Sequence, residues 1–389
     1  MTPPARVAAA IEILDTALTG VAVEKALTNW ARGHRFAGSK DRAAIRDLVF
    51  DAIRQKLSRV GHSGVLSGRG LMLGGFAGEL EAAEEMFSGQ GYGPSSLSEA
   101  EREALKNPKP LSESERLDCP EWLLPQMESS LGAKKEMVLE ALRHRASVYL
   151  RVNLARTTLD SVIKQLGKDE IVAHPHPLAS TCLEVVQNAR RLKSSQAYSD
   201  GLVELQDAAS QALVEALPLS KGMKVLDYCA GGGGKSLAMA ATGATVFAHD
   251  AAPARMRDLP ARASRAQCNI HIRETGALAE TGPFDLVLCD APCSGSGAWR
   301  RAPQGKWDLT PEGLASLIET QREILSLAKG LVKPGGALAY ATCSLLDCEN
   351  IDQSEWFVSE NSSWSLEWSH SFLPSDGGDG FFGAVFRKP

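Results

Sequence analysis

Residues 224–236 read KVLDYCAGGGGKS, which places a short apolar strand and four consecutive glycines directly before a helical segment. Glycine between a strand and a helix lets the backbone approach a ligand with no side chain in the way. This strand opens an alternation of short apolar strands and helical segments, which is typical of a parallel sheet covered by helices on both faces. We therefore predict an α/β fold with a doubly wound sheet. Its predicted strands are 224–228, 245–248, 269–273, 284–289 and 337–342.

The glycine loop is compatible with three kinds of ligand. A triphosphate-binding loop of the form G-x-x-x-x-G-K-[ST] ends correctly at Ser236, but Cys229 stands where its first glycine belongs. A dinucleotide fingerprint fails because Ser236 also occupies the position of its third glycine. S-adenosylmethionine needs close backbone approach and a carboxylate for the ribose, and Asp250 closes the next predicted strand. Asp250 could instead only cap a predicted helix over 253–266.

Two cysteines follow the predicted strands of this domain. The strand 284–289 is followed by Asp290-Ala291-Pro292-Cys293-Ser294-Gly295, and Cys343 comes directly after the strand 337–342. In open α/β sheets, ligands bind outside the carboxyl ends of the strands. We therefore expect the glycine loop, Asp290, Cys293 and Cys343 to converge on one crevice.

The eight cysteines allow other roles. Six of them lie from Cys229 onward and no secretory signal precedes them, so no disulfide framework is expected. Zinc ligation could be counted from two pairs, Cys289 with Cys293 and Cys343 with Cys348, but no histidine lies near them. We expect no metal site. Burial as small apolar side chains is expected for Cys119, Cys182, Cys268 and Cys289.

A cysteine beside S-adenosylmethionine suits methylation of a pyrimidine at C5. This carbon is a poor nucleophile until a thiolate adds to C6 and makes C5 enamine-like. The thiol must then leave, which requires a base for the C5 proton and an acid near N3 of the ring. One cysteine, one carboxylate and a second thiol fit these tasks, and Lys235 could lower a thiol pKa or contact the base.

Length and composition describe an ordinary globular chain. The 389 residues are 44% hydrophobic and 23% charged, which predicts two or three domains with packed cores. No apolar run approaches the ~18 residues of a membrane span, so we expect a soluble, cytoplasmic protein with no membrane partner. Residues 1–60 carry ten Lys or Arg and six Asp or Glu, a local charge of +4 within a chain of net charge -5. A basic face, if present, is local.

Three domains are predicted: 1–135, 136–205 and 206–389. The first is helical, with Ser39 as a predicted N-cap and an apolar stripe that begins at Ile45. The second is a small α/β module with a strand at 148–152 and a helix at 158–166. The third contains the doubly wound sheet.

Four motifs carry a resemblance to a known family. These are the glycine loop from Cys229 to Lys235, the segment from Asp290 to Gly295, Thr342-Cys343-Ser344 and the closing Asp379-Gly380-Phe381-Phe382. They resemble the Sun/Fmu (RsmB-like) RNA cytosine-5 methyltransferases, and Gln206-Asp207-Ala208-Ala209-Ser210 also resembles a family segment. The resemblance implies a Rossmann-like methyltransferase sheet and S-adenosyl-L-methionine as cofactor.

The resemblance also implies roles for individual residues. It makes Cys343 the nucleophile, gives Cys293 a part in product release, and gives Asp290 contacts to cytosine and cofactor. Lys235 closes the cofactor loop and is counted with the catalytic residues. The implied cofactor-binding residues are Cys229, Ala230, Gly231, Gly232, Gly233, Gly234, Lys235, Asp250 and Asp290.

The N-terminal helices resemble a NusB-like RNA-binding domain, through Arg35-Phe36-Ala37-Gly38-Ser39-Lys40-Asp41-Arg42. Basic side chains there would contact phosphates, which set affinity rather than sequence choice. Near Trp299 and Trp307, where family members hold RNA, aromatic stacking with flanking arginines suits an unpaired base, although Trp307 could equally be core packing. The implied RNA-binding residues are Arg35, Lys40, Arg42, Arg300 and Arg301, with Arg32 and Arg46 as further candidates.

The chain departs from the family pattern at two places. Gly231-Gly232 stand where the family usually has Ala-Pro, which predicts a more flexible loop. An acid expected near Thr275 is absent unless Glu274 replaces it. Both departures concern contacts to the cofactor.

The sequence thus predicts a monomeric enzyme that methylates C5 of an unpaired or extruded cytosine in RNA, with 16S rRNA as the substrate implied by the resemblance. The reaction would pass through a covalent bond between Cys343 and C6. Two other classes stay open, a P-loop-like NTPase and a catalytically silent RNA-binding factor for ribosome assembly. The sequence does not identify the cytosine or tell free rRNA from a ribosomal particle.

Overall fold

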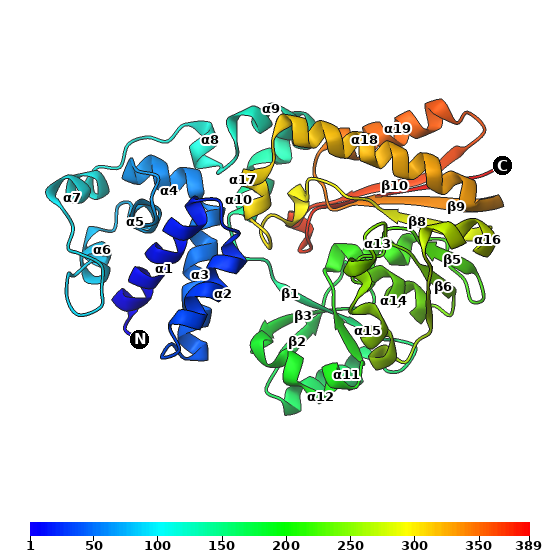
Figure 1. Cartoon of the computed structure of the whole chain (residues 1–389), viewed down its shortest axis with the longest axis horizontal. Coiled ribbons are helices and arrows are strands. Elements are labelled where there is room, and N and C mark those ends of the chain that lie inside the picture. Colours follow the sequence, from blue (N-terminus) through cyan, green and yellow to red (C-terminus); the bar gives the residue numbers. More distant parts are fainter. The chain divides into compact units, whose positions relative to one another are not determined.

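The computed structural model describes residues 1–389, which form two compact units (Figure 1). The first unit comprises Met1–Glu128, Gly132–Arg145 and Trp299–Asp308. The second comprises Ser129–Leu131, Ala146–Ala298 and Leu309–Pro389. Both units are therefore built from segments that are distant in the sequence.

The first unit is helical. Helix α3 shows why: Ile45, Val49 and Ile53 recur at helical spacing and are buried in the unit's core. The helix begins at Ser39, but its N-cap is Gly38, one residue before the predicted cap. The chain's helices up to residue 142 are α1 (Pro3–Leu18), α2 (Val23–Gly33), α3 (Ser39–Arg54), α4 (Lys56–Ser63), α5 (Gly68–Leu73), α6 (Leu80–Met86), α7 (Glu99–Lys106), α8 (Glu113–Arg116), α9 (Leu124–Leu131) and α10 (Lys135–Leu142).

A segment from the C-terminal half completes the helical unit. Residues Trp299–Asp308, which include helix α17 (Gln304–Asp308), belong to it although the sequence placed them in the methyltransferase domain. Trp307 Nε1 donates to the carbonyl of Ile53 (2.7 Å), and Lys306 Nζ donates to the carbonyl of Arg54 (3.1 Å). Burial lowers the pKa of Lys306 to about 8. Trp307 thus packs in the core, the second of the two roles considered for it.

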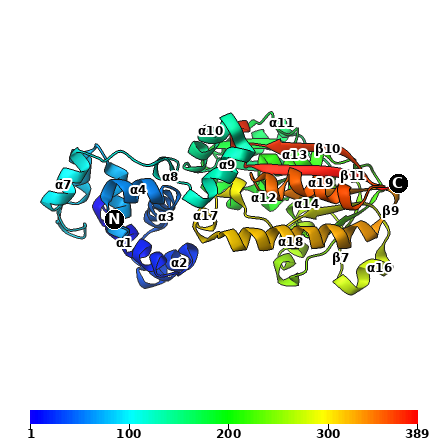
Figure 2. The same cartoon turned by 90° about the horizontal axis from the view of Figure 1, so that it is seen from above.

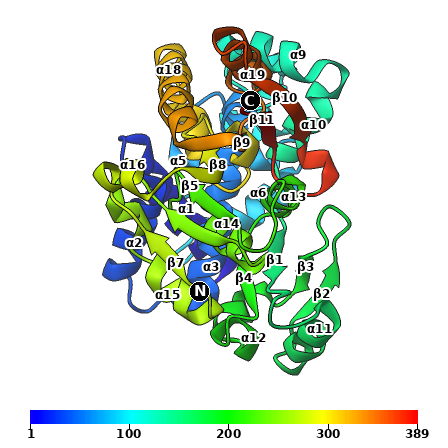
Figure 3. The same cartoon turned by 90° about the vertical axis from the view of Figure 1, so that its right-hand side faces the viewer.

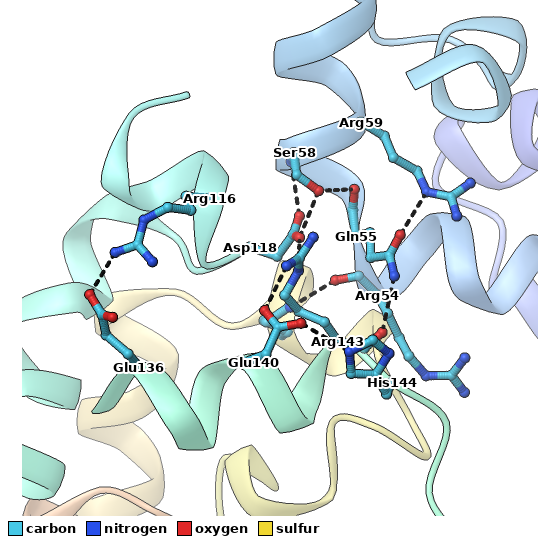
Figure 4. Close-up of polar contacts among 11 residues, drawn as sticks. Arg54, Gln55, Ser58, Arg59, Arg116, Asp118, Glu136, Glu140, Arg143 and His144 are labelled. Carbon is cyan, nitrogen blue, oxygen red and sulfur yellow. Dashed lines mark hydrogen bonds and ion pairs between the residues drawn. The ribbon is translucent and has the colours of Figure 1, made fainter. Parts of the chain in front are cut away.

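A buried carboxylate joins three parts of the helical unit. Asp118 is fully buried and accepts hydrogen bonds from Ser58 N (2.9 Å) and Ser58 Oγ (2.8 Å) on α4 (Figure 4). It also accepts one from Arg143 Nε (2.8 Å), which follows α10. A buried charge is tolerated when it is paired and hydrogen-bonded in this way.

Replacing this carboxylate is expected to destabilise the fold strongly. In Asp118→Ala, Arg143 loses its buried partner, and breaking such a pair costs about 3–5 kcal/mol of the free energy of unfolding. Urea unfolding measures the effect. The matched control is Glu136→Ala, whose ion pair with Arg116 is exposed and is worth under about 1 kcal/mol (Figure 4). Equal losses in the two variants would contradict this assignment.

The second unit contains two sheets. The smaller sheet has the order β2-β3-β1-β4 and is antiparallel throughout its registered pairs. Helices α11 (Leu159–Lys168) and α12 (Gln196–Ser199) accompany it. The sheet confirms the strand predicted at 148–152, which is its β1. Its strands are β1 (Val148–Val152), β2 (Val172–Pro175), β3 (Cys182–Gln187) and β4 (Val203–Leu205).

The larger sheet has seven strands in the order β10-β11-β9-β8-β5-β6-β7. Its central strands are parallel, whereas β10 and β11 form an antiparallel edge beside β9. The Rossmann-like fold class is thereby confirmed. The strands are β5 (Lys224–Asp227), β6 (Thr245–Ala248), β7 (Ile270–Ile272), β8 (Phe284–Asp290), β9 (Val332–Thr342), β10 (Ser365–Phe372) and β11 (Phe381–Arg387).

Alternating apolar side chains bury both faces of this sheet. Val225 lies in a core cluster with α13 (Ala208–Ala216) and α14 (Gly234–Ala241), whereas its neighbour Leu226 lies in another with α18 (Pro311–Ala328) and α19 (Ile351–Glu360). Figure 3 shows these helix pairs on opposite sides of the sheet, and Figure 2 shows α18 running along it. The remaining helices are α15 (Leu259–Ala266) and α16 (Leu278–Thr281).

One predicted helix is interrupted. The structure has a 3-10 turn, η5 (Pro253–Met256), and then α15, in place of one helix over 253–266. Pro260 stands in the first turn of α15, where proline is tolerated, but it has no N–H to donate to the carbonyl of Met256, as one continuous helix would require. No helix in the structure is both long and apolar enough to cross a bilayer.

Candidate active site

The glycine loop turns the chain sharply between β5 and α14. Gly233 caps the helix with a φ of +79°, and a Cβ there would lie 2.1 Å from the Leu259 side chain. Only glycine satisfies both conditions. The loop therefore presents bare backbone at the carboxyl edge of the sheet.

Asp250 fixes this loop from the next strand end. Its carboxylate accepts hydrogen bonds from the backbone of Gly231 (2.9 Å) and Ala252 (2.9 Å), and it lies 3.3 Å from Arg255. Asp250 thus supports the glycine loop, a contact not considered from the sequence, and its bond from Ala252 N fixes the turn before the 3-10 segment that begins at Pro253. A loop without side chains beside a buried carboxylate fits an adenosine, which needs close approach and an acceptor for its ribose hydroxyls.

The smaller sheet supports the glycine loop from behind. Arg151 on β1 is buried and donates to the carbonyl of Gly234 (2.7 Å) and to Gln206 Oε1. Arg262 on α15 donates to the carbonyl of Gly232. These contacts restrain the loop where glycines replace the family's Ala-Pro. Neither arginine was predicted, because both are far from the loop in sequence.

Lys235 and Asp290 form an ion pair at the carboxyl edge of the sheet. Their side chains lie 2.7 Å apart, and Lys235 also lies 4.6 Å from the ring centroid of Phe381. Burial alone would lower the pKa of Lys235, but Asp290 outweighs it and the pKa is raised, with a smaller contribution from Cys343. Lys235 is therefore a charged donor to Asp290.

A second carboxylate, Asp227 at the end of β5, was missed by sequence reasoning. It is buried, and its Oδ2 accepts a hydrogen bond from Ser236 Oγ (2.6 Å). Burial raises its pKa to about 7. The sequence signal that could have identified Asp227 as a site residue is its position, two residues before Cys229 and the glycine loop.

The structure brings the two strand-end cysteines together. Cys293 Sγ and Cys343 Sγ lie 3.5 Å apart, and both residues are partly exposed. The hydrogen bond with Cys343, reinforced by burial, raises the pKa of Cys293 well above its usual range. Cys293 thus keeps its proton at neutral pH.

The backbone around the cysteines is closely packed. Gly297 N donates to the carbonyl of Cys343 (3.0 Å), and Gly380 N donates to the carbonyl of Gly297 (3.0 Å). A Cβ on Gly297 would lie 2.0 Å from the Gly380 carbonyl oxygen. The segments after β8, after β9 and before β11 therefore meet at one point, which places the closing Asp379-Gly380-Phe381-Phe382 motif beside the thiols.

The predicted RNA-binding residues differ in exposure. Arg35, Lys40 and Arg42 are exposed, as are the further candidates Arg32 and Arg46. Four of these arginines line a groove of about 560 Å³ between α2 and α3, and the adjoining Phe36 is 73% exposed. The groove is lined by Glu24, Leu27, Thr28, Trp30, Ala31, Arg32, Arg35, Arg42, Ala43, Ile45 and Arg46.

Arg300 departs from the expectation of a surface phosphate contact. It is only 7% exposed, because residues 299–308 pack into the helical unit, where its carbonyl accepts a hydrogen bond from Arg54 Nε (2.7 Å). Arg301 is exposed. Trp299 is also buried, so it offers no free face for a base.

The remaining expectations concern cysteines and Thr275. Cys119, Cys182 and Cys289 are buried, whereas Cys268 is partly exposed. The structure contains no group of three or more His, Cys, Asp and Glu placed to hold a metal ion. Thr275 Oγ1 lies 2.9 Å from His249 Nε2, and the neighbouring Glu274 is exposed.

Two family profiles match the chain. Residues 214–386 match the family described as 16S rRNA methyltransferase RsmB/F, and residues 119–191 match the ferredoxin-like domain of RsmF/B-like methyltransferases. The ribosomal RNA small subunit methyltransferase B of Photorhabdus laumondii is 31% identical over 284 residues, which are 69% of this chain and 66% of that protein. That of Proteus mirabilis is 32% identical over 282 residues, 69% of this chain and 65% of that protein.

Solved structures share the fold. The crystal structure of PH0851 aligns with a TM-score of 0.77 and 22% identity, covering 100% of this chain and 99% of that one. NSun6 from Pyrococcus horikoshii, solved with SFG, aligns with a TM-score of 0.61 and 17% identity, covering 69% of this chain and 98% of that one. At these identities the likeness concerns the fold alone.

Proposed function

This chain belongs to the 16S rRNA methyltransferase RsmB/F family, and we propose that it transfers a methyl group from S-adenosylmethionine to C5 of a cytosine in RNA, most specifically 16S rRNA. The observation that carries the proposal is the pair of thiols at 3.5 Å, Cys293 and Cys343, beside the charged Lys235–Asp290 pair. Family membership gives the methyltransferase class. The thiols supply what C5 chemistry in particular requires.

In the proposed reaction, Cys343 is the nucleophile. Its thiolate adds to C6, and the electron pair of the C5–C6 double bond becomes available at C5. Bound S-adenosylmethionine would supply the electrophilic methyl group that C5 takes up, and S-adenosylhomocysteine would be the leaving group. A base then removes the C5 proton, the double bond re-forms, and the bond from C6 to Cys343 breaks to return the thiolate.

The other residues of the crevice support these steps. Asp290 and Lys235 would contact the ring and stabilise the charge that develops on it. Cys293 retains its proton and lies against Cys343, which suits a part in release of the product. The glycine loop from Cys229 to Lys235 and Asp250 would hold the cofactor, with Asp290 at the boundary between cofactor and base.

We also propose that the helical unit binds RNA. The groove between α2 and α3 offers exposed arginines for phosphates, and the exposed ring of Phe36 offers a surface for stacking an unpaired base. Arg35, Lys40 and Arg42 are the proposed contacts, and exposed Arg301 remains a candidate. Arg300 is left out because its side chain is buried.

Removing these charges is expected to weaken RNA binding and to make the affinity less dependent on salt concentration. In Arg35→Ala and Lys40→Ala, the slope of log affinity against log salt should fall by about one per residue, with a roughly uniform loss across RNA sequences. Filter binding at several salt concentrations measures the slope. Lys168→Ala, which removes an exposed charge on α11, serves as the control. A slope unchanged from the control would place the RNA contacts elsewhere.

The function itself is tested with isotope-labelled S-adenosylmethionine and a 16S rRNA transcript. Transfer of label into RNA, recovered as 5-methylcytidine after digestion, is the expected result. ATP turnover without transfer would favour the NTPase alternative, and RNA binding with neither reaction would favour an assembly factor. Small ribosomal subunits in place of the transcript show which form of the RNA is used.

A further inference from the structure

A fully buried carboxylate lies beneath the two cysteines. Glu349 is 0% exposed and ends the 3-10 turn η9 (Asp347–Glu349), shortly after β9. No arginine, lysine or histidine contacts it in the structure. A buried charge without a cation is costly unless several hydrogen bonds satisfy it. The hydrogen bonds that Glu349 accepts therefore indicate which segments of the chain this carboxylate holds together.

Glu349 bridges the segments that carry the two thiols. Ser294, next to Cys293, donates to it through its backbone N (2.8 Å) and its Oγ (2.5 Å). Ser344, next to Cys343, donates through its Oγ (2.5 Å). The carboxylate thus touches the residue after each cysteine.

The same carboxylate also connects to helix α18. Gln321 on this helix is buried, and its Nε2 donates both to Glu349 (3.0 Å) and to the carbonyl of Pro292 (3.0 Å). Pro292 directly precedes Cys293. The Cys293 segment is therefore held from both sides, by Ser294 on one and Pro292 on the other.

We propose that Glu349 is a positioning residue that sets the separation of Cys293 and Cys343. The inference rests on the proposed function, because it assigns the two thiols to one reaction. The segments follow the ends of two neighbouring strands, β8 and β9, and both lie beyond the last registered pair of those strands, Asp290 with Ala341. A shared acceptor between their serines couples them, so that attack and release occur on one ring position.

A carboxylate is needed here because all four partners approach as donors. Both serine hydroxyls already accept hydrogen bonds, Ser294 Oγ from Ser296 N (3.3 Å) and Ser344 Oγ from Leu346 N (3.0 Å). The one proton of each hydroxyl is directed to Glu349, whose oxygen at 2.5 Å is nearer than Ser296 Oγ at 3.1 Å. A glutamine would replace one acceptor oxygen by an amide that donates. Either the two hydroxyls that share Oε2 or the two N–H donors that share Oε1, Ser294 N and Gln321 Nε2, would then lose their acceptor.

The test separates positioning from folding. The probe is an RNA in which the target cytosine carries fluorine at C5, which blocks loss of the C5 substituent and retains the covalent adduct. In Glu349→Gln, the single-turnover rate of adduct formation should fall by about 10²-fold, the size of effect expected from a small misplacement of reacting groups. Affinity for S-adenosylmethionine, measured by calorimetry, should stay within about twofold, because Glu349 does not contact the glycine loop.

The control is Glu355→Gln, an exposed glutamate on α19 with the same change of charge, which should keep the wild-type rate. An adduct rate in Glu349→Gln equal to that of Glu355→Gln would overturn the inference. If Glu349→Gln does not fold, the double variant Ser294→Ala with Ser344→Ala removes the hydroxyl donors and must show the same loss. A wild-type protein that forms no adduct at all would instead count against the proposed function.

Discussion

Cys343→Ala is expected to abolish methyl transfer, lowering the rate by at least about 10³-fold. Without the thiolate, C5 is not activated, and the remaining thiol, Cys293, keeps its proton at neutral pH. Methyl transfer into 16S rRNA from labelled S-adenosylmethionine measures the loss. Cofactor affinity should be retained, since the glycine loop and Asp250 do not depend on this side chain.

The control for this variant is Cys348→Ala. Cys348 is also a partly exposed cysteine after β9, but burial raises its pKa to about 11 and it makes no contact with Cys293. It should transfer methyl groups at the wild-type rate. Retained transfer in Cys343→Ala, or equal loss in both variants, would remove Cys343 from its proposed role.

Cys293→Ala is expected to trap RNA on the protein. Attack by Cys343 and methyl transfer need not involve the missing thiol, but release of the product does, so the bond to C6 persists. A denaturing gel with labelled RNA should show a slow-migrating complex that is nearly absent from the wild type. The complex should require S-adenosylmethionine, because release follows methyl transfer.

The double variant Cys293→Ala with Cys343→Ala provides the decisive control. It should form no complex, because the bond that retains RNA comes from Cys343 itself. A complex that survives in the double variant would have another origin. A complex formed by Cys343→Ala but not by Cys293→Ala would reverse the two roles.

Much of the catalytic sheet could be predicted from the sequence, because strands buried on both faces read as short apolar runs. The strand predicted at 245–248 matches β6, and 284–289 differs from β8 only by Asp290. The edge strand β10 was missed, since most of its side chains are exposed and it has no apolar run. Strands β2 and β4 of the smaller sheet were missed because their four and three residues are too few for a period to be recognised, and β3 was missed although it is longer than the predicted β1.

The residues of the candidate site that could be predicted from the sequence are those that directly follow predicted strands. The proximity of Cys293 and Cys343 could be predicted because the carboxyl ends of neighbouring parallel strands meet at one edge of the sheet. Glu349 could not, because its role depends on hydrogen bonds from Ser294 and Ser344 that only the folded chain shows. Arg300 was misplaced for the opposite reason, since a charged residue beside an aromatic looks exposed until its segment is seen to pack in a core.

The ten residues Trp299–Asp308 lie in the sequence between two segments of the second unit, but they belong to the first unit. No single cleavage can therefore divide this polypeptide into two intact halves. A fragment that stops after residue 145 lacks the indole of Trp307 that bonds to Ile53, and a fragment that starts there carries that indole with nothing to receive it. Evolution by simple fusion or loss of either half is restricted in the same way, because each half would have to inherit a piece of the other.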